Sequence, residues 1–372
     1  MSSENSAMGN TKSKPIRDKG GKNPIVKVVF KFAALYILLD ILLIGLCSAT
    51  GGNIFHLILW VYISNFVIVP FIAIIYAVFQ FIRENYRVSL AVFVIAVIFL
   101  STFVYATFIE PKDLKIKRHQ IFTDKFTGEV TIAHITDFQS AKVGAYENWV
   151  IETINEIDPD IIFHTGDFVQ PYNSEDRIGE IKKLAGLFKK LNPKYGTYNV
   201  MGNIETVSDI KVFDQISGTN TLLDENIIIS DTGIELDILG LSLAKSMKGD
   251  RYGITRWLIK SKDKFTILLG HAPDYVIDIR DKDIDLCLAG HTHGGQIRLP
   301  FIGPLMTASS VPREWAMGFR RIGQLYLNVS AGIGAERLEG LPAIRFNCPP
   351  DISIITVTGR TSPSSGGDAS TR

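Results

Sequence analysis

The chain has too few cysteines and too balanced a charge for several classes of protein. Its 372 residues include only three cysteines, Cys47, Cys287 and Cys348, whose odd number and irregular spacing give neither a disulfide framework nor a zinc knuckle. The 39 basic and 38 acidic side chains nearly cancel, so no excess of positive charge points to nucleic acid. No internal repeat is present. The length fits one or two globular domains of ordinary composition.

The first third of the chain contains three long runs that are almost free of charge. They cover residues 32–49, 54–81 and 88–108. Each run reaches the roughly 18 to 20 residues that cross a bilayer core, and none has the polar face of a globular helix. Asp40 and Asn65 are polar exceptions, and we favour a packing contact between helices over an intramembrane site for them. We therefore predict three transmembrane helices within residues 30–109 of a multi-pass membrane protein.

Basic residues beside these runs predict an orientation in the membrane. Residues 1–29, which we expect to be a disordered cytoplasmic arm, are rich in Lys and Arg, and Arg83 and Arg87 lie between the second and third runs. Such charges favour the cytoplasmic side, so three spans place everything after residue 109 on the non-cytoplasmic side. Four basic residues that follow the third run argue against this orientation, namely Lys112, Lys115, Lys117 and Arg118.

Residues 123–358 have the pattern of an α/β domain. The apolar runs 130–135, 160–164 and 196–200 are typical of strands, and the amphipathic stretches 146–157 and 181–191 are typical of helices. This alternation predicts βαβ units with their site at the carboxyl ends of the strands. The strand-rich stretches 226–244 and 324–358 predict a second, mixed sheet. Residues 359–372 are rich in Gly, Ser and Thr, which predicts a disordered tail.

Metal-ligand side chains follow five of the predicted strands. A single acid after a strand usually caps a helix or forms a turn, and two histidines between glycines alone would also fit a solvated turn. The repetition at five strands is harder to dismiss, because carboxylate, carboxamide and imidazole are all ligands for divalent ions. In chain order the residues are Asp137 and Gln139, Asp167, Asn203 and Glu205, His271 after the run 265–269, and His291 and His293 after the run 284–288.

These motifs resemble those of the calcineurin-like metallophosphoesterases, whose pattern is Asp-x-His, Gly-Asp, Gly-Asn-His-Asp/Glu, Gly-His and Gly-His-x-His. The chain is most similar to the membrane-attached branch, whose last motif reads Gly-His-Thr-His-Gly-Gly-Gln-Ile. The resemblance runs from about residue 131 to 357. It implies that residues 123–358 form a two-sheet αββα sandwich, preceded here by the membrane domain.

The resemblance also implies a centre of two divalent metal ions bridged by Asp167. One ion would be held by Asp137, Gln139 and His293, and the other by Asn203, His271 and His291. A hydroxide between the two ions would attack phosphorus, so the implied reaction is hydrolysis of a phosphoester or a diphosphate. Attachment to a membrane implies a lipid-linked substrate by analogy.

Two positions depart from the family pattern. Gln139 replaces a histidine, and its carboxamide oxygen favours Mn²⁺, with Mg²⁺, iron and Zn²⁺ as alternatives. Ile204 replaces the histidine that, in the family, contacts the phosphate and assists the leaving group. Losing a general acid typically costs about 10² to 10⁴ in rate. No other residue is a certain catalytic replacement: we expect Glu205 to support the site, and His134 and His164 to be buried, hydrogen-bonded histidines.

Two functions therefore stay open. The first is a membrane-anchored phosphoesterase or diphosphatase with two metal ions, whose partners are the lipid bilayer and a phosphoester and do not include nucleic acid. The second is a catalytically impaired membrane scaffold that binds metal and phosphate, because of Ile204. A transporter has little support, since the three runs hold few polar groups, Asp40 and Asn65 among them, that could line a path.

Overall fold

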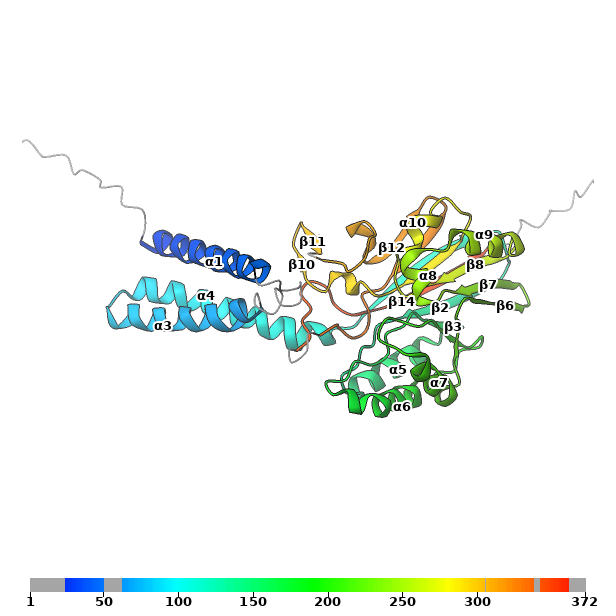
Figure 1. Ribbon diagram of the computed structural model, residues 1–372, viewed down its shortest axis with the longest axis horizontal. Helices are drawn as coiled ribbons and strands as arrows, with labels where there is room; N and C mark the ends of the chain where they lie inside the picture. The colour runs from blue at the N-terminus through cyan, green and yellow to red at the C-terminus, as the bar shows by residue number, and fades with distance from the viewer. Residues whose placement is uncertain (1–23, 50–61, 305, 338–341, 361–372) are drawn as a thin grey trace, which may run out of the picture. The chain divides into compact units, whose positions relative to one another are not determined.

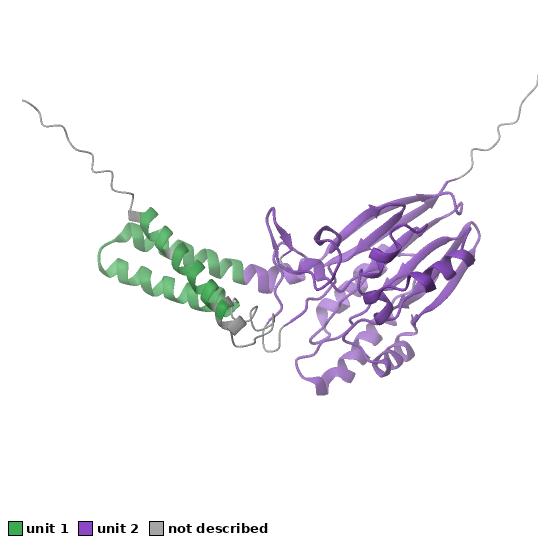
Figure 2. Cartoon of the chain, turned by 45° about the horizontal axis from the view of Figure 1, so that its top comes forward, with its two compact units in different colours: residues 1–103 green, residues 104–372 purple. Residues whose placement is uncertain are grey.

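The computed structural model describes residues 24–49, 62–304, 306–337 and 342–360. The chain divides into two compact units, Met1–Phe103 and Val104–Arg372 (Figure 2). The first unit is helical, and the second contains all of the strands that the structure describes.

The first unit contains three of the α-helices. They are α1 (Pro24–Ala49), α3 (Val69–Ile82), which continues the π-helical turn η1 (Ser64–Ile68), and α4 (Tyr86–Val104), which continues through η2 (Tyr105–Ile109) and η3 (Glu110–Lys112) into the second unit. Within the described residues, two helices are long and apolar enough to cross a membrane, Ser64–Ile82 and Tyr86–Lys112. The run 32–49 lies in α1, which is not one of the two, and part of the run 54–81 lies outside the described residues. A domain of three spans is therefore not confirmed.

Small side chains pack the helices of the first unit together. Ala73 and Ala77 of α3 are buried against Val92 and Ala96 of α4, and small residues allow helices to approach closely. The buried Asn65 accepts a hydrogen bond from the hydroxyl of Tyr36 in α1. This contact between helices agrees with the packing role that we favoured for Asn65.

The second unit is built on two six-stranded sheets. The first has the order β1 (Lys115–Thr123), β14 (Asp351–Gly359), β2 (Glu129–Ile135), β3 (Ile161–His164), β4 (Thr197–Asn199) and β5 (Asn220–Thr221). The second has the order β12 (Gly318–Ile322), β13 (Leu325–Val329), β9 (Leu286–Ala289), β8 (Phe265–Leu269), β7 (Ile234–Gly240) and β6 (Glu225–Asp231). Both sheets mix parallel and antiparallel pairs.

The two sheets pack face to face with helices outside them (Figure 1). Apolar side chains from both sheets, such as Ile132 and Phe163 on one side and Ile267 and Leu286 on the other, form a single buried cluster. A second cluster lies between the first sheet and the helices α5 (Ala145–Ile157), α6 (Arg177–Phe188) and α7 (Val207–Ser217), and a third covers the second sheet beneath α9 (Arg251–Lys260) and α10 (Tyr275–Ile279). The predicted α/β class and its mixed sheets are confirmed.

Two strands differ from the expectation. β1 was not predicted, because its basic residues lack the apolar alternation of a half-buried strand, yet it pairs in parallel with β14 over its whole length. The stretch 324–358 was assigned to the second sheet as a whole, but its last part, β14, lies in the first sheet between β1 and β2. An almost wholly buried run such as β14 carries no sign of which sheet it joins.

Candidate metal centre

The topology brings the predicted ligands to one edge of the sandwich. β2, β3 and β4 are parallel neighbours, and so are β8 and β9, so that their carboxyl ends meet at the same edge of each sheet. The loops after these strands carry all seven predicted ligands, Asp137, Gln139, Asp167, Asn203, His271, His291 and His293.

Five of these seven residues have a left-handed backbone. Asp137, Gln139, Asp167, His291 and His293 have φ angles of 50°, 37°, 63°, 66° and 47°. Such angles are uncommon for residues other than glycine, and they cluster at functional sites, where the surrounding structure holds them in place. The strained loops therefore mark the same edge of the sandwich as the ligand chemistry does.

The first group of predicted ligands has acceptor atoms without partners. Asp137 Oδ1, Gln139 Oε1 and His293 Nε2 are buried and have no hydrogen-bond partner among the described residues. The other carboxylate oxygen of Asp137 accepts hydrogen bonds from Thr136 Oγ1 at 2.8 Å and from the His291 amide at 3.0 Å, and His293 Nε2 lies 3.5 Å from Asp137 Oδ1. Buried polar atoms are normally paired, so this group fits a cation.

The second group presents lone pairs to one another. His271 Nδ1 donates to the Thr165 carbonyl at 2.7 Å, so in the neutral ring the lone pair is on Nε2. That atom lies 2.9 Å from Asn203 Oδ1 and 3.2 Å from His291 Nδ1. His291 Nε2 donates to the Ala308 carbonyl at 3.2 Å, which places the lone pair of its neutral ring on Nδ1. Three acceptors that face each other repel unless a proton or a metal ion lies among them.

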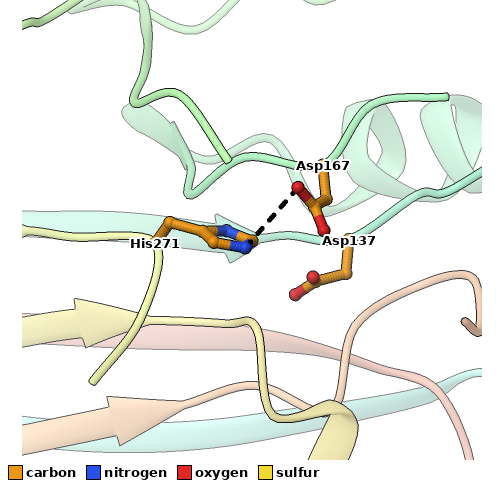
Figure 3. A group of neighbouring side chains, drawn as sticks. All are labelled: Asp137, Asp167 and His271. Carbon is orange, nitrogen blue, oxygen red and sulfur yellow. Dashed lines mark ion pairs between the residues drawn. The ribbon is translucent and has the colours of Figure 1, made fainter. Parts of the chain in front are cut away.

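Asp167 lies between the two groups. Its Oδ1 is 3.5 Å from His271 Nε2 and accepts a hydrogen bond from the Ile204 amide at 3.2 Å, while its Oδ2 accepts one from Gln139 Nε2 at 2.9 Å. The ligand atoms of Asp137, Asp167 and His271 lie within 4.8 Å of one another, and all three side chains are buried and converge (Figure 3). The arrangement fits a carboxylate shared by two cations.

Burial and neighbouring charges shift the pKa values of the site's acids and histidines in different directions. Burial raises the pKa of Asp137 to about 7, and the charge of Asp167 adds to this increase. Burial alone would lower the pKa of His271, but the charges of Asp167 and Asp137 outweigh it and raise the value. Burial lowers the pKa of His293, well below its ordinary value, and that of His291. Without metal, the raised pKa values favour protonation of Asp137 and His271, and the lowered pKa values favour neutral imidazoles at His291 and His293.

Ile204 and Glu205 follow Asn203 in the loop after β4. Ile204 offers the site only its amide, because its side chain has no polar atom. The buried carboxylate of Glu205 accepts hydrogen bonds from the amides of Gly202, Asp167 and Phe168 at 2.8, 3.1 and 2.6 Å, and burial raises its pKa to about 7. Glu205 thus joins the loops after β3 and β4 and holds Asp167 beside Asn203.

His134 and His164 are both buried in the core, and His164 Nε2 has no hydrogen-bond partner among the described residues. His134 is fully buried, accepts a hydrogen bond from Asn328 Nδ2 at 2.7 Å and contacts Thr165 Oγ1 at 3.0 Å. The ring of His164 is stacked on Phe168 with the ring centres 4.4 Å apart, and burial holds its pKa well below the ordinary value. Both are therefore core histidines, as the sequence predicted.

Arginines hold the loops in place, and they were not predicted from the sequence. The guanidinium of the fully buried Arg345 donates to the carbonyls of Ala331, Gly332, Gly334 and Cys348. The amide of Gly334 in turn donates to the Asp137 carbonyl at 2.7 Å. Arg337 Nη1 donates to the Gln139 carbonyl at 2.9 Å. The sequence signals for this loop were the paired glycines 332 and 334 and the resemblance of the runs 325–334 and 344–352 to the membrane-attached branch.

Comparison with known proteins finds similar chains among the metallophosphoesterases. Residues 130–295 match the family described as calcineurin-like phosphoesterase. YkuE of Bacillus subtilis, an uncharacterized metallophosphoesterase, is 29% identical over 271 residues, which are 68% of this chain and 88% of YkuE. YaeI of Escherichia coli, a phosphodiesterase, is 33% identical over 89 residues, 24% of this chain and 31% of YaeI. Among solved structures, TT1561 of Thermus thermophilus has a TM-score of 0.36 and 11% identity, over 55% of this chain and 90% of that one.

Proposed function

We propose that this chain, which belongs to the calcineurin-like metallophosphoesterase family through its residues 130–295, is a membrane-anchored hydrolase of phosphoesters or diphosphates that uses two divalent metal ions. The observation that carries the proposal is the set of buried acceptors without partners among the described residues, Asp137 Oδ1, Gln139 Oε1 and His293 Nε2, beside the facing lone pairs of His271 and His291.

The side chains divide into two sets of ligands with Asp167 between them. Asp137, Gln139 and His293 would hold one ion, and Asn203, His271 and His291 the other. Two oxygen donors from carboxamides, Gln139 and Asn203, favour Mn²⁺ over Zn²⁺, with Mg²⁺ and iron as alternatives. Ions held by these residues would supply a nucleophilic water at neutral pH and would neutralise charge on the phosphate.

The remaining groups of the site orient the ligands. The Thr165 and Ala308 carbonyls fix the tautomers of His271 and His291, so that each ring turns a lone pair toward the centre. Glu205 and Arg345 hold the loops that carry Asp167 and Asp137. Ile204 cannot donate a proton to the leaving oxygen, so the chain is best suited to substrates whose leaving group departs without an acid, such as a diphosphate or an aryl phosphodiester.

Anchoring in a membrane is supported by the helices of the first unit. Only 28% and 17% of the residues in the most apolar 18-residue stretches of Ser64–Ile82 and Tyr86–Lys112 are buried, whereas the core helix of a soluble protein is mostly buried. Phe71, Ile75 and Phe93 are among the apolar side chains exposed on these helices, and exposed apolar surface of this kind suits lipid. We further propose that α1 is a third span and that residues 123–358 lie on the non-cytoplasmic side, as the basic residues before α1 and at Arg83 and Arg87 favour.

A lipid-linked phosphodiester is the substrate that fits both the metal centre and the membrane helices. The relative YaeI is named a phosphodiesterase, and a hydrolase fixed to a bilayer meets substrates that are themselves held there. The competing function is a scaffold that binds metal and phosphate without turnover, and the observation that favours it is Ile204 in place of the acid.

The test is hydrolysis of bis-p-nitrophenyl phosphate by the full chain in detergent, after chelation and with Mn²⁺ restored. Its leaving group needs little help from an acid, so the assay is lenient toward Ile204. We expect turnover that depends on Mn²⁺, is lost in Asp167→Asn and is kept in Asp263→Asn, the same substitution at an exposed carboxylate. Bound metal without turnover in the wild type would favour the scaffold. If the wild type neither binds metal nor turns over the substrate, both functions are overturned.

A further inference from the structure

A small hairpin beside the metal centre ends in an exposed apolar tip. β10 (Arg298–Leu299) and β11 (Gly303–Pro304) pair as an antiparallel hairpin that projects from the sandwich (Figure 1). At its tip Phe301 is fully exposed and Ile302 is 63% exposed. Phe301 also has a φ of 66°, which is rare for a bulky residue. A turn that holds a phenylalanine outward in this way presents it for contact with something apolar.

The base of this hairpin is bound to the segment Arg345–Cys348. Ile297 forms a bridge with Phe346, and the Arg298 amide donates to the Phe346 carbonyl at 2.9 Å. The Phe346 amide donates to the Gln296 carbonyl at 3.0 Å. These backbone bonds fix the hairpin to the body of the second unit.

The same segment holds the end of the second candidate span. Within the second unit, the Arg345 amide donates to the Ala106 carbonyl at 2.9 Å, and the Asn347 amide donates to Glu110 Oε2, also at 2.9 Å. The buried Glu110 carboxylate also accepts the Cys348 amide. Four consecutive residues thus tie the end of the helix Tyr86–Lys112 to the hairpin.

The helix end is apolar as well. Tyr105 is 41% exposed and Ile109 is 53% exposed, and Lys112 follows at the end of the helix. Aromatic and basic residues are typical of the boundary between lipid and water. A strand rises about 3.3 Å per residue, so the tip of the hairpin lies on the order of 10 Å from its base, which is comparable with the depth of about 5 to 10 Å that interfacial elements reach in lipid.

The hairpin is also part of the metal centre's own loop. The chain runs from His293 through Gly294 into β10, where Arg298 Nη1 donates back to the Gly294 carbonyl at 2.7 Å. After β11 it returns to Ala308, whose carbonyl accepts the hydrogen bond from His291. A surface that binds the hairpin would therefore lie next to the metal centre.

We propose that the β10–β11 hairpin, together with Tyr105 and Ile109, is a membrane-contact surface whose partner is the interface of the lipid bilayer. The inference rests on the membrane anchoring in the proposed function and goes beyond it, because it fixes which edge of the domain meets the lipid. The metal centre then lies close to the bilayer surface, where the phosphate of a membrane lipid or lipid-linked compound lies.

The test places a fluorophore at the tip of the hairpin in the full chain. With Cys47→Ser, Phe301→Cys is labelled with nitrobenzoxadiazole, and the protein is reconstituted into vesicles of phosphatidylethanolamine and phosphatidylglycerol that contain nitroxide-labelled lipid. Ile259→Cys is the matched control, since Ile259 is an exposed apolar residue (73%) on α9. We expect strong quenching at position 301 and little at 259.

The outcomes distinguish failure of the contact surface from failure of the membrane anchoring. If the protein floats with the vesicles and positions 301 and 259 are quenched equally, the contact surface is wrong while the anchoring stands. If the protein does not float with the vesicles, the anchoring fails and the surface fails with it.

A second measurement uses turnover. Phe301→Ser should keep the rate on bis-p-nitrophenyl phosphate in solution and lose on the order of tenfold on hexadecyl p-nitrophenyl phosphate held in vesicles, as expected for removing one buried aromatic contact. Ile259→Ser should change neither rate. Equal losses on both substrates in Phe301→Ser would contradict the proposal.

Discussion

Gly202 offers the sharpest perturbation of the metal centre. A Cβ built on Gly202 would lie 2.9 Å from Cγ of Asp167 and 2.5 Å from its backbone nitrogen and would overlap its Oδ1, whereas ordinary contacts are 3.4 Å or longer. Because φ of Gly202 does not lie in the left-handed region, alanine suits the local backbone, and the conflict falls on Asp167. We expect Gly202→Ala to fold and to move the carboxylate of Asp167 by about half an ångström or more.

The size of the effect follows from that displacement. Ligand constellations have to be held within about 0.5 Å, and a misplacement of about 1 Å can cost on the order of 10²-fold in rate. We expect a loss of roughly 10²-fold in kcat/KM for bis-p-nitrophenyl phosphate and of about 10- to 100-fold in Mn²⁺ affinity, similar to the loss of a group that orients a ligand. Overpacking should cost about 1 to 3 kcal/mol of stability.

The assay compares two substitutions of the same kind. Gly186 lies in α6, and a Cβ added there would have nothing within 4 Å, so Gly186→Ala should keep full activity and gain up to about 1 kcal/mol from the helical preference of alanine. Turnover, Mn²⁺ titration and thermal unfolding are measured on both variants in the full chain. Wild-type turnover and Mn²⁺ affinity in Gly202→Ala would refute the proposed role of Asp167 as a ligand shared by two ions.

Three further predictions follow from the same site. Ile204→His should raise kcat/KM for an alkyl phosphodiester by about 10² to 10⁴ and much less for bis-p-nitrophenyl phosphate; equal gains on both would contradict a role as general acid. Since burial raises the pKa of Asp137 to about 7, protons compete with Mn²⁺ below that pH, and the apparent Mn²⁺ affinity in titrations should rise toward pH 7 and level off above it; a Mn²⁺ affinity independent of pH between 5 and 7 would argue against Asp137 as a ligand. In the metal-free protein, the stabilisation that comes from this raised pKa is lost as the pH rises through 7. Arg345→Met should leave the carbonyls of Ala331, Gly332 and Gly334 without their hydrogen-bond donor and cost about 3 to 5 kcal/mol of stability. Thermal unfolding measures this loss, and an unchanged unfolding temperature would show that these bonds do not support the loop.

The ligand-bearing loops could be predicted because most of them follow a short apolar strand, the loop after β4 (Thr197–Asn199) being the exception. Runs such as 265–269 and 130–135 are short, apolar and end in a residue of distinct chemistry, so their structure and position are set locally. The parallel pairing of β2 with β3 and of β8 with β9 then brings their ends together. In physical terms, the strand ends converge because of topology that the alternation of strands and helices already implies.

The supporting contacts could not be predicted in the same way. Arg345 is hydrogen-bonded to carbonyls 3 to 14 residues away, and an arginine near the end of a chain is expected at the surface until its surroundings are known. The hairpin 298–304 was also missed, because the two paired residues on each side are too few to form a pattern. β1 was hidden by its lysines, which suit a strand at the edge of a sheet.

The most direct test of the account is a Mn²⁺ titration of the full chain in which bound metal and hydrolysis of bis-p-nitrophenyl phosphate are measured on the same sample. We expect binding to saturate at two ions for each chain, turnover to rise with the second ion, and both to be lost in Asp167→Asn. Saturation at two ions with no turnover at any loading would contradict the proposed enzyme and leave a metal-binding scaffold. Turnover that persists without metal would contradict the proposed centre itself.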